Sequence, residues 1–122
     1  SIPGVGKILG ATIALETGQI ERFPGPGQYA SYARCVNTEK ISNGKTKGRG
    51  NKKNGNKYLA WAFMEAAHYA AIWSPEIKRF YQQRKAKRHI LVAKKTVANK
   101  LARACYHMLS NKEAFDVQRA FG

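Results

Sequence analysis

Apolar residues recur at helical spacing in several separate stretches of the chain. The clearest stretch is 57–73, where apolar residues return every three or four positions. That spacing places them on one face of a helix. Asn56 stands directly before the stretch and is a favourable N-cap residue. The pattern predicts an inward-facing stripe made of Leu59, Ala62, Phe63, Ala66, Ala67, Ala70 and Trp73.

Two helices are expected before this stretch. One begins near Gly6 and ends at Gly18, a residue type that commonly follows the last turn of a helix. The other covers about 28–34, after a cluster of prolines and glycines at 24–27 that interrupts regular structure. In this second helix we expect the inward-facing residues to be Tyr29, Tyr32 and Ala33.

Helical signals continue after residue 73. Ser74, Pro75 and Glu76 are residue types found at a helix start. A long helix is expected over about 90–109, and a short one around Phe115. No segment predicts a strand, so we expect an all-α fold: a small helical domain with a helix-hairpin-helix-like turn at its N-terminus and a long basic loop between helices. The long helix is expected to turn inward Ile90, Val97, Leu101, Ala104, Cys105 and Met108.

The net charge of the chain limits the classes of function that it fits. The 122 residues include 22 Lys and Arg against 7 Asp and Glu, a formal net charge of +15. So much like charge on one small domain favours a polyanionic partner. Nucleic acid fits better than a membrane, because a core explains the apolar residues and no apolar run approaches the ~20 residues of a membrane span. A protein that is merely basic is the alternative.

Cysteine and acid positions predict no metal site in this chain. Cys35 and Cys105 are far apart and have no zinc-type spacing. We expect both to be buried free thiols in a reducing cytoplasm. A single disulfide between them is the alternative. Glu65 and His68 lie on the same helical face. Two potential metal ligands without further ligands beside them favour structural or surface roles for both residues. Because the chain starts without Met and shows no signal peptide, we expect a processed chain or a piece of a longer protein.

The segment 36–57 differs in composition from the rest of the chain. From Lys40 onward it is rich in Gly, Asn and cations and contains no acid. We interpret it as a basic loop that orders on nucleic acid, with a solvated linker as the alternative. Ser42 alone is more typical of a turn residue than of a nucleophile, because a serine hydroxyl needs activation. The candidate phosphate contacts of the loop are Lys45, Lys47, Arg49, Lys52, Lys53 and Lys57.

Two further segments have phosphate-binding features. A Pro-Gly-x-Gly turn at the start of a helix, with Gly4, Gly6 and Lys7, exposes consecutive backbone N–H groups that can hold a phosphate oxygen. An ordinary glycine-rich cap is the alternative. The stretch 78–103 has many cations and no acid, which is typical of a nucleic-acid-binding groove or, alternatively, of a solvated helix exterior. Its candidate contacts are Arg84, Lys85, Lys87 and Arg88.

These blocks together resemble a known family. The sequence is similar to the C-terminal domain of DEDD-type insertion-sequence transposases, the IS110/IS1111 group, over roughly residues 2–109. The order and spacing of the blocks carry the resemblance. They are Ile2-Pro3-Gly4-Val5-Gly6, Ile20-Glu21-Arg22-Phe23, Tyr29-Ala30-Ser31-Tyr32-Ala33, Ser42-Asn43-Gly44-Lys45 and the stretch 53–62.

The resemblance implies DNA recombination through a serine. Ser42 matches the serine of the family's S-x-G-K block, which is thought to attack DNA and form a phosphoserine link. Many members carry a second serine where this chain has Lys52, so Ser42 is the remaining candidate in the loop. The resemblance also implies an N-terminal RuvC-like half with acidic ligands for Mg²⁺, a guide RNA, a homo-oligomer and a cytoplasmic, nucleoid-associated protein in bacteria. No cofactor is expected in this domain itself.

The expected organisation follows from these blocks. Residues 1–109 form the transposase C-terminal domain, with a hairpin-helix part at 1–35, the basic loop at 36–57 and a helical part at 57–109, before a tail at 110–122. We expect transposase activity from the full-length protein, and nucleic-acid binding without strand transfer from this chain alone. The alternatives are a non-catalytic helix-hairpin-helix-like binding module and a structural RNA-binding protein.

Overall fold

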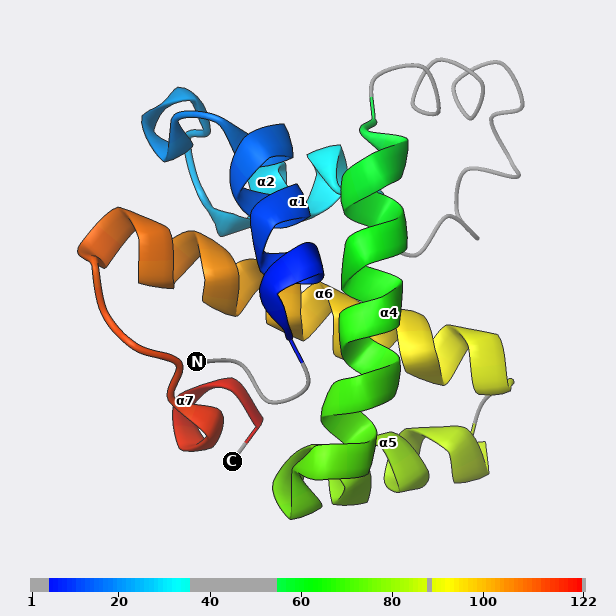
Figure 1. The fold of residues 1–122 in the computed structure, drawn as a ribbon. Coiled ribbons are helices and arrows are strands. Elements are labelled where there is room, and N and C mark those ends of the chain that lie inside the picture. Colours follow the sequence, from blue (N-terminus) through cyan, green and yellow to red (C-terminus); the bar gives the residue numbers. More distant parts are fainter. Residues whose placement is uncertain (1–4, 36–54, 88, 122) are drawn as a thin grey trace.

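A computed structural model describes residues 5–35, 55–87 and 89–121. Within these ranges the chain is helical and has no strand, so the all-α prediction is confirmed (Figure 1). The elements are α1 (Lys7–Thr17), the 3₁₀ turn η1 (Ile20–Arg22), α2 (Pro26–Tyr32), α4 (Lys57–Trp73), α5 (Pro75–Lys87), α6 (Ile90–Asn111) and α7 (Val117–Phe121).

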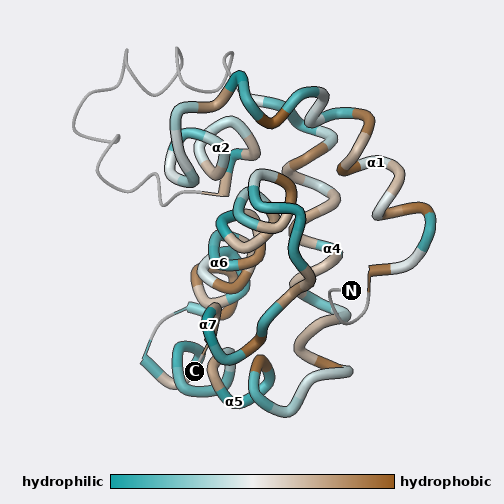
Figure 2. The backbone as a smooth tube through the Cα atoms, turned by 90° about the vertical axis from the view of Figure 1, so that its left-hand side faces the viewer, coloured by the Kyte–Doolittle hydropathy of each residue, from teal (hydrophilic) through white to brown (hydrophobic). Residues whose placement is uncertain are grey.

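Helix α6 is the centre of the arrangement. It packs against α2, α4 and α5, and it passes behind α1 and α4 in Figure 1. The tube in Figure 2 changes between hydrophilic and hydrophobic along each helix, as expected for helices that bury one side. Val97 and Leu101 of α6 meet Leu59 and Phe63 of α4 in one core cluster. Each such fully buried side chain contributes about 1.5–3 kcal/mol to folding.

Helix α4 begins and ends as the sequence predicts. The Asn56 side chain accepts hydrogen bonds from the backbone N–H of Tyr58 (2.9 Å) and Leu59 (3.0 Å) and so caps the helix. All predicted stripe residues are buried except Trp73, which is 69% exposed. The prediction for Trp73 is wrong because it is the last residue of α4. The chain turns there into α5, and most of the side chain stays exposed.

The turn between α1 and α2 is closed by polar contacts at the end of α1. Gly18 has a φ of +65°, a conformation that favours glycine and ends the helix. The Thr17 and Tyr29 hydroxyls share a buried hydrogen bond of 2.6 Å. Arg22 donates two hydrogen bonds to the Thr17 carbonyl, at 2.8 and 3.1 Å. This carbonyl is at the C-terminus of α1, where the helix dipole favours a cation. The Arg22 guanidinium also lies over the Tyr32 ring.

The short helix α2 lies slightly earlier than the sequence predicts. It begins at Pro26 and ends at Tyr32, because proline fits the first helical turn and Ala33 is already the C-cap. Tyr29 and Ala33 are buried, while Tyr32 is only half-buried.

The second half of the chain follows the predicted order with three local differences. Ser74 accepts a hydrogen bond from the Ile77 N–H (3.4 Å) and donates one to Glu76 (3.2 Å), so it caps α5 as expected. Helix α6 extends to Asn111, and its first residue, Ile90, is exposed rather than inward-facing, because it lies at the helix end. The last helix begins two residues after Phe115, at Val117.

Candidate nucleic-acid interface

The structure describes part of the candidate site. Ser42 lies outside the described residues. The same holds for Gly4, Lys45, Lys47, Arg49, Lys52, Lys53 and Arg88. The described candidates are Gly6, Lys7, Lys57, Arg84, Lys85 and Lys87.

The chain on each side of the segment 36–54 is anchored to the same part of the fold, at Cys35 and at Asn56. On one side, the Cys35 carbonyl accepts a hydrogen bond of 2.9 Å from the side-chain amide of Asn99 on α6. On the other side, the Asn56 N–H donates to the Tyr32 carbonyl at 2.7 Å. Since Tyr32 and Cys35 are three residues apart, the chain leaves and re-enters the described fold at the end of α2.

The Asn56 side chain connects the elements at this junction, which is where the ends of α1 and α2 meet the start of α4. Its carbonyl oxygen caps α4, and its amide donates to the Glu16 carboxylate (3.0 Å) and to the Tyr32 hydroxyl (3.2 Å). One residue therefore joins the ends of α1 and α2 to the start of α4. The hydrogen bond from Asn56, together with the nearby Arg22, lowers the pKa of Tyr32.

Arg34 and Gly55 form a second contact across the junction. Arg34 has a φ of +57°, which is uncommon for a residue other than glycine. Its guanidinium donates to the Gly55 carbonyl at 3.5 Å, and its side chain fills the space where a Cβ on Gly55 would lie. Glycine is thus required by close approach at this position.

The N-terminus of α1 has no side-chain cap. Gly6 is the N-cap residue in an extended conformation, and its carbonyl accepts the first helical hydrogen bond, from Gly10, at 2.9 Å. The first turn contains no acid, and Lys7 is exposed. Backbone N–H groups at such an end attract anions.

The described cations of α5 are exposed, and two of them lie over aromatic rings. Arg84, Lys85 and Lys87 all face solvent. The Arg84 guanidinium lies 4.9 Å from the Phe80 ring centroid, and the Lys85 ammonium 5.8 Å from that of Tyr81. In the described part of the chain, none of these cations forms an ion pair. Their charge is therefore available to a polyanion.

Two cationic regions are separated by the length of α4. Lys57 is the first residue of α4 and borders the junction, whereas α5 follows the last residue of that helix (Figure 1). A helix of this length spans about 24 Å at 1.5 Å per residue. Lys57 and the α5 cations thus lie in two regions, and Gly6 and Lys7 lie at the start of α1, the end opposite to Glu16.

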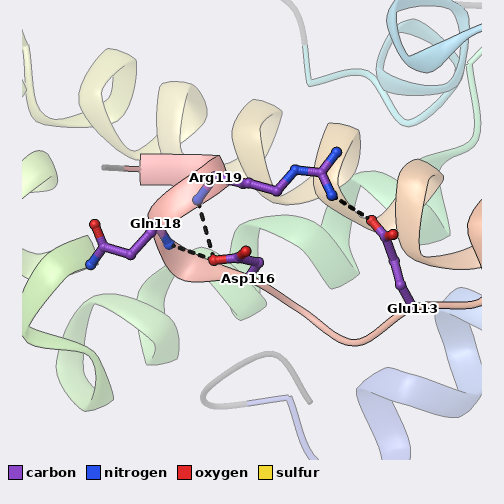
Figure 3. A network of polar contacts seen from close by, with 4 residues as sticks. All are labelled: Glu113, Asp116, Gln118 and Arg119. Atoms are coloured by element: carbon purple, nitrogen blue, oxygen red, sulfur yellow. Dashed lines mark hydrogen bonds and ion pairs between the residues drawn. The ribbon is translucent and has the colours of Figure 1, made fainter.

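A shallow cavity of about 280 Å³ lies between α6 and the C-terminal segment. Its lining includes Lys100, Arg103 and His107, but also Glu113 and Asp116. Figure 3 shows that both acids are engaged: Glu113 pairs with Arg119 at 3.0 Å, and Asp116 caps α7 through the N–H groups of Gln118 and Arg119. The mixed charge makes this cavity a weaker anion site than α5.

The two cysteines are buried free thiols, as predicted. Burial raises the pKa of Cys35 to about 12 and that of Cys105 to about 11, so both stay neutral and poor as nucleophiles at neutral pH. Residues 5–35, 55–87 and 89–121 contain no group of three or more His, Cys, Asp or Glu that could hold a metal ion. Their helices also include none that is long and apolar enough to cross a bilayer.

Sequence reasoning missed the polar partners at the junction. It identified Asn56 as a cap but not as the link to Glu16 and Tyr32. Asn99 was not singled out at all, because its partner, Cys35, is 64 positions away and no local pattern signals such a contact.

The fold and the junction define a small, basic, all-helical domain with a cation-rich segment at 36–54. The family description "Transposase IS116/IS110/IS902 family" matches residues 1–82. The chain therefore belongs to this family of insertion-sequence transposases. No match was found among curated proteins or among solved structures.

Proposed function

We propose that this chain is the DNA-binding and catalytic C-terminal domain of an insertion-sequence transposase, with Ser42 as the nucleophile. The observation that carries the proposal is the anchoring of both ends of the segment 36–54. Cys35 is fixed to Asn99, and Asn56 is fixed to Tyr32 and Glu16. A segment that holds a phosphodiester must be oriented relative to the rest of the fold, and rigid attachment points serve that need.

The proposed chemistry is a transesterification. The Ser42 Oγ attacks the phosphorus of a DNA phosphodiester, a serine–phosphate ester bond forms, and one P–O bond to a DNA sugar breaks. The hydroxyl proton of Ser42 passes to a base, and the leaving sugar oxygen takes up a proton. The cations of the segment would stabilise the negative charge that develops on the phosphorus oxygens.

The base is proposed to come from outside this chain. Among the described residues, the carboxylate nearest the junction is Glu16, and it already accepts a hydrogen bond from Asn56. An acidic, Mg²⁺-binding RuvC-like half, as the family resemblance implies, would supply activation. We therefore infer that this chain alone binds nucleic acid but completes no strand transfer. Detectable strand exchange by the isolated chain would contradict that inference.

The cationic surface supports a nucleic-acid partner. The exposed cations of α5 have no ion-pair partner among the described residues. A guide RNA, a homo-oligomeric full-length protein and a cytoplasmic, nucleoid-associated location are proposed on the resemblance alone.

The test is covalent trapping with the full-length protein, its element-end DNA, its transcript and Mg²⁺. We expect the wild type to form a protein–DNA adduct and Ser42→Ala to form none while still binding DNA. Ser31→Ala is the matched control, because Ser31 is an exposed serine close to the junction. An adduct with Ser42→Ala would mean that another residue is the nucleophile. This domain would then be a non-catalytic binding module.

A further inference from the structure

The cavity between α6 and the C-terminal segment has no role in the function proposed above. Its lining residues lie beyond the range 1–82 that the family description matches, so family membership does not account for it. Its volume of about 280 Å³ is slightly below the range of about 300–1,000 Å³ that is usual for small-molecule sites. The occupant must therefore be small, such as a single nucleobase with its sugar.

The C-terminal wall of the cavity is fixed to α5. The Phe121 ring meets the Phe80 ring of α5 edge to face, with the two centroids 5.3 Å apart. Asp116 caps α7, and Arg119 pairs with Glu113 in the turn before that helix (Figure 3). These contacts shape the wall from within the chain, as in the largely preformed pockets of small-molecule sites.

Lys100 links the cavity to the cations of α5. It lines the cavity, and its ammonium lies 5.2 Å from the Phe80 ring centroid. The Arg84 guanidinium lies 4.9 Å from the same centroid. Because both cations lie against one ring, they are close enough for a single strand of nucleic acid to contact both.

The basic side of the cavity offers donors for a phosphate. Arg103 donates from its Nε to Asn99 at 3.0 Å, and in the described part of the chain its two terminal nitrogens form no hydrogen bond or ion pair. Lys100 has no ion-pair partner there either. The planar side chains of Arg103 and His107, which both line the cavity, are of the types against which unstacked bases pack.

The acidic side of the cavity offers acceptors for the edge of a base. Glu113 and Asp116 each engage one carboxylate oxygen in the contacts of Figure 3, and no hydrogen bond among the described residues engages the other oxygen. A carboxylate accepts from the exocyclic amino group of cytosine, adenine or guanine, but it has no proton to donate to O4 of thymine. The same two acids disfavour an acidic peptide or a lone phosphate as the occupant.

We propose that this cavity holds one unstacked nucleotide of a single-stranded nucleic acid, with its phosphate at Lys100 and Arg103 and its amino-bearing base donating to Glu113. A single strand fits because pairing in a duplex keeps the base stacked and out of reach of a cavity. The inference rests on the nucleic-acid partner of the proposed function, but not on Ser42. It adds the form of the strand and the class of base.

Fluorescence anisotropy with labelled strands of about ten nucleotides tests the class of base. We expect oligo(dC) to bind the chain about five- to tenfold more tightly than oligo(dT), which is the effect of one hydrogen bond to a charged group. An oligo(dT) strand with a single central cytosine should already gain most of this difference, because the cavity holds one base. Free cytidine monophosphate should compete only weakly, since it lacks the contacts with α5.

Glu113→Gln tests the assigned acceptor. Its amide both accepts and donates, so the preference for cytosine over thymine should fall to about twofold or less. Arg119→Gln is the matched control, because it removes the same ion pair but keeps the Glu113 carboxylate, and the preference should remain. Both residues are exposed, so circular dichroism should show a retained fold. Arg103→Gln should weaken both strands equally, since a phosphate contact carries no base identity.

The outcomes separate this inference from the proposed function. Equal affinities for the cytosine and thymine strands would overturn the inference and leave nucleic-acid binding intact. So would a preference that survives Glu113→Gln. Cytidine monophosphate that binds as tightly as the strand would make the cavity a site for free nucleotides, and the inference would be wrong. A chain that binds neither strand nor duplex would contradict both the inference and the nucleic-acid partner on which it rests.

Discussion

At the scale of single residues, Asn56 has the most consequential side chain in the described fold. It caps α4 and also donates to Glu16 and Tyr32. We expect Asn56→Ala to lower the free energy of unfolding by about 2–3 kcal/mol, since it removes a cap worth about 1 kcal/mol and two further hydrogen bonds of similar size. Urea denaturation followed by circular dichroism measures the change.

Asn56→Ser separates the two roles of this side chain. Serine keeps the cap but does not reach Glu16, so its loss of stability should be intermediate between wild type and alanine. Equal losses for serine and alanine would mean that the cap contributes nothing. A serine variant as stable as the wild type would mean that the contacts with Glu16 and Tyr32 contribute nothing.

The buried thiols predict how stability changes at alkaline pH. Burial raises the pKa of Cys35 to about 12 and that of Cys105 to about 11, from an ordinary value of 9.0. Above pH 9 the unfolded chain releases thiol protons that the folded chain keeps. The free energy of unfolding should therefore fall as pH rises toward 11 and 12, by up to about 1.4 kcal/mol per pH unit for each thiol.

A variant without thiols isolates this effect from other groups that titrate in the same window. Cys35→Ala/Cys105→Ala should show a shallower decline in the free energy of unfolding between pH 9 and 11. Identical pH profiles for the two proteins would contradict the predicted contribution. At neutral pH, alkylation of both thiols by iodoacetamide should be slow in the folded protein and fast in urea.

At the scale of elements, two glycines should respond in opposite directions to alanine. Gly10 lies inside α1, and a Cβ there would be in ordinary contact with Val5 at 3.9 Å. Gly10→Ala should stabilise the protein by about 0.5–1 kcal/mol through helix propensity. A Cβ on Gly55 would overlap the Arg34 side chain, so Gly55→Ala should destabilise it.

A double-mutant cycle checks the cause of the Gly55 effect. In an Arg34→Ala background the overlap is removed, and Gly55→Ala should cost less than it does in the wild type. Thermal unfolding of the four proteins gives the coupling. Additive effects of the two substitutions would show that the Arg34 side chain is not what excludes a Cβ.

The elements were predictable where local chemistry marks their ends. Asn56 before α4 and Ser74-Pro75-Glu76 before α5 are helix-start signals, and both starts were located correctly. The start of α2 was displaced by two residues, since Pro26 can stand either before a helix or in its first turn. Trp73 and Ile90 were assigned inward positions that periodicity allows, but helix ends project beyond the partner helix.

At the scale of the whole molecule, the sequence alone does not determine which helices pack against one another. Periodicity identified the buried side of α4, but it does not tell which helices cover that side. The contact between Asn99 and Cys35 and the separation of Lys57 from α5 likewise depend on tertiary packing. Ser42 and its neighbours lie outside the described residues, so their assignment stays a prediction from the resemblance.

The salt dependence of DNA binding tests whether the cations of α5 act as a unit. Each phosphate contact adds about −0.9 to the slope of log affinity against log salt on duplex DNA, so six contacts would give roughly −5. Replacing Arg84, Lys85 and Lys87 together with Gln should make the slope less negative by about 2.7. Fluorescence anisotropy of a labelled duplex at several salt concentrations measures it.

Arg119→Gln is the reference for the salt experiment, because Arg119 is already paired with Glu113. This substitution should therefore change the slope of log affinity against log salt only a little. All three replaced side chains are exposed, so circular dichroism should show a retained fold. An unchanged slope in the triple variant would assign phosphate binding to other cations, such as those near the junction. A wild-type affinity that does not respond to salt would remove nucleic acid as the partner, since backbone contacts necessarily release counterions.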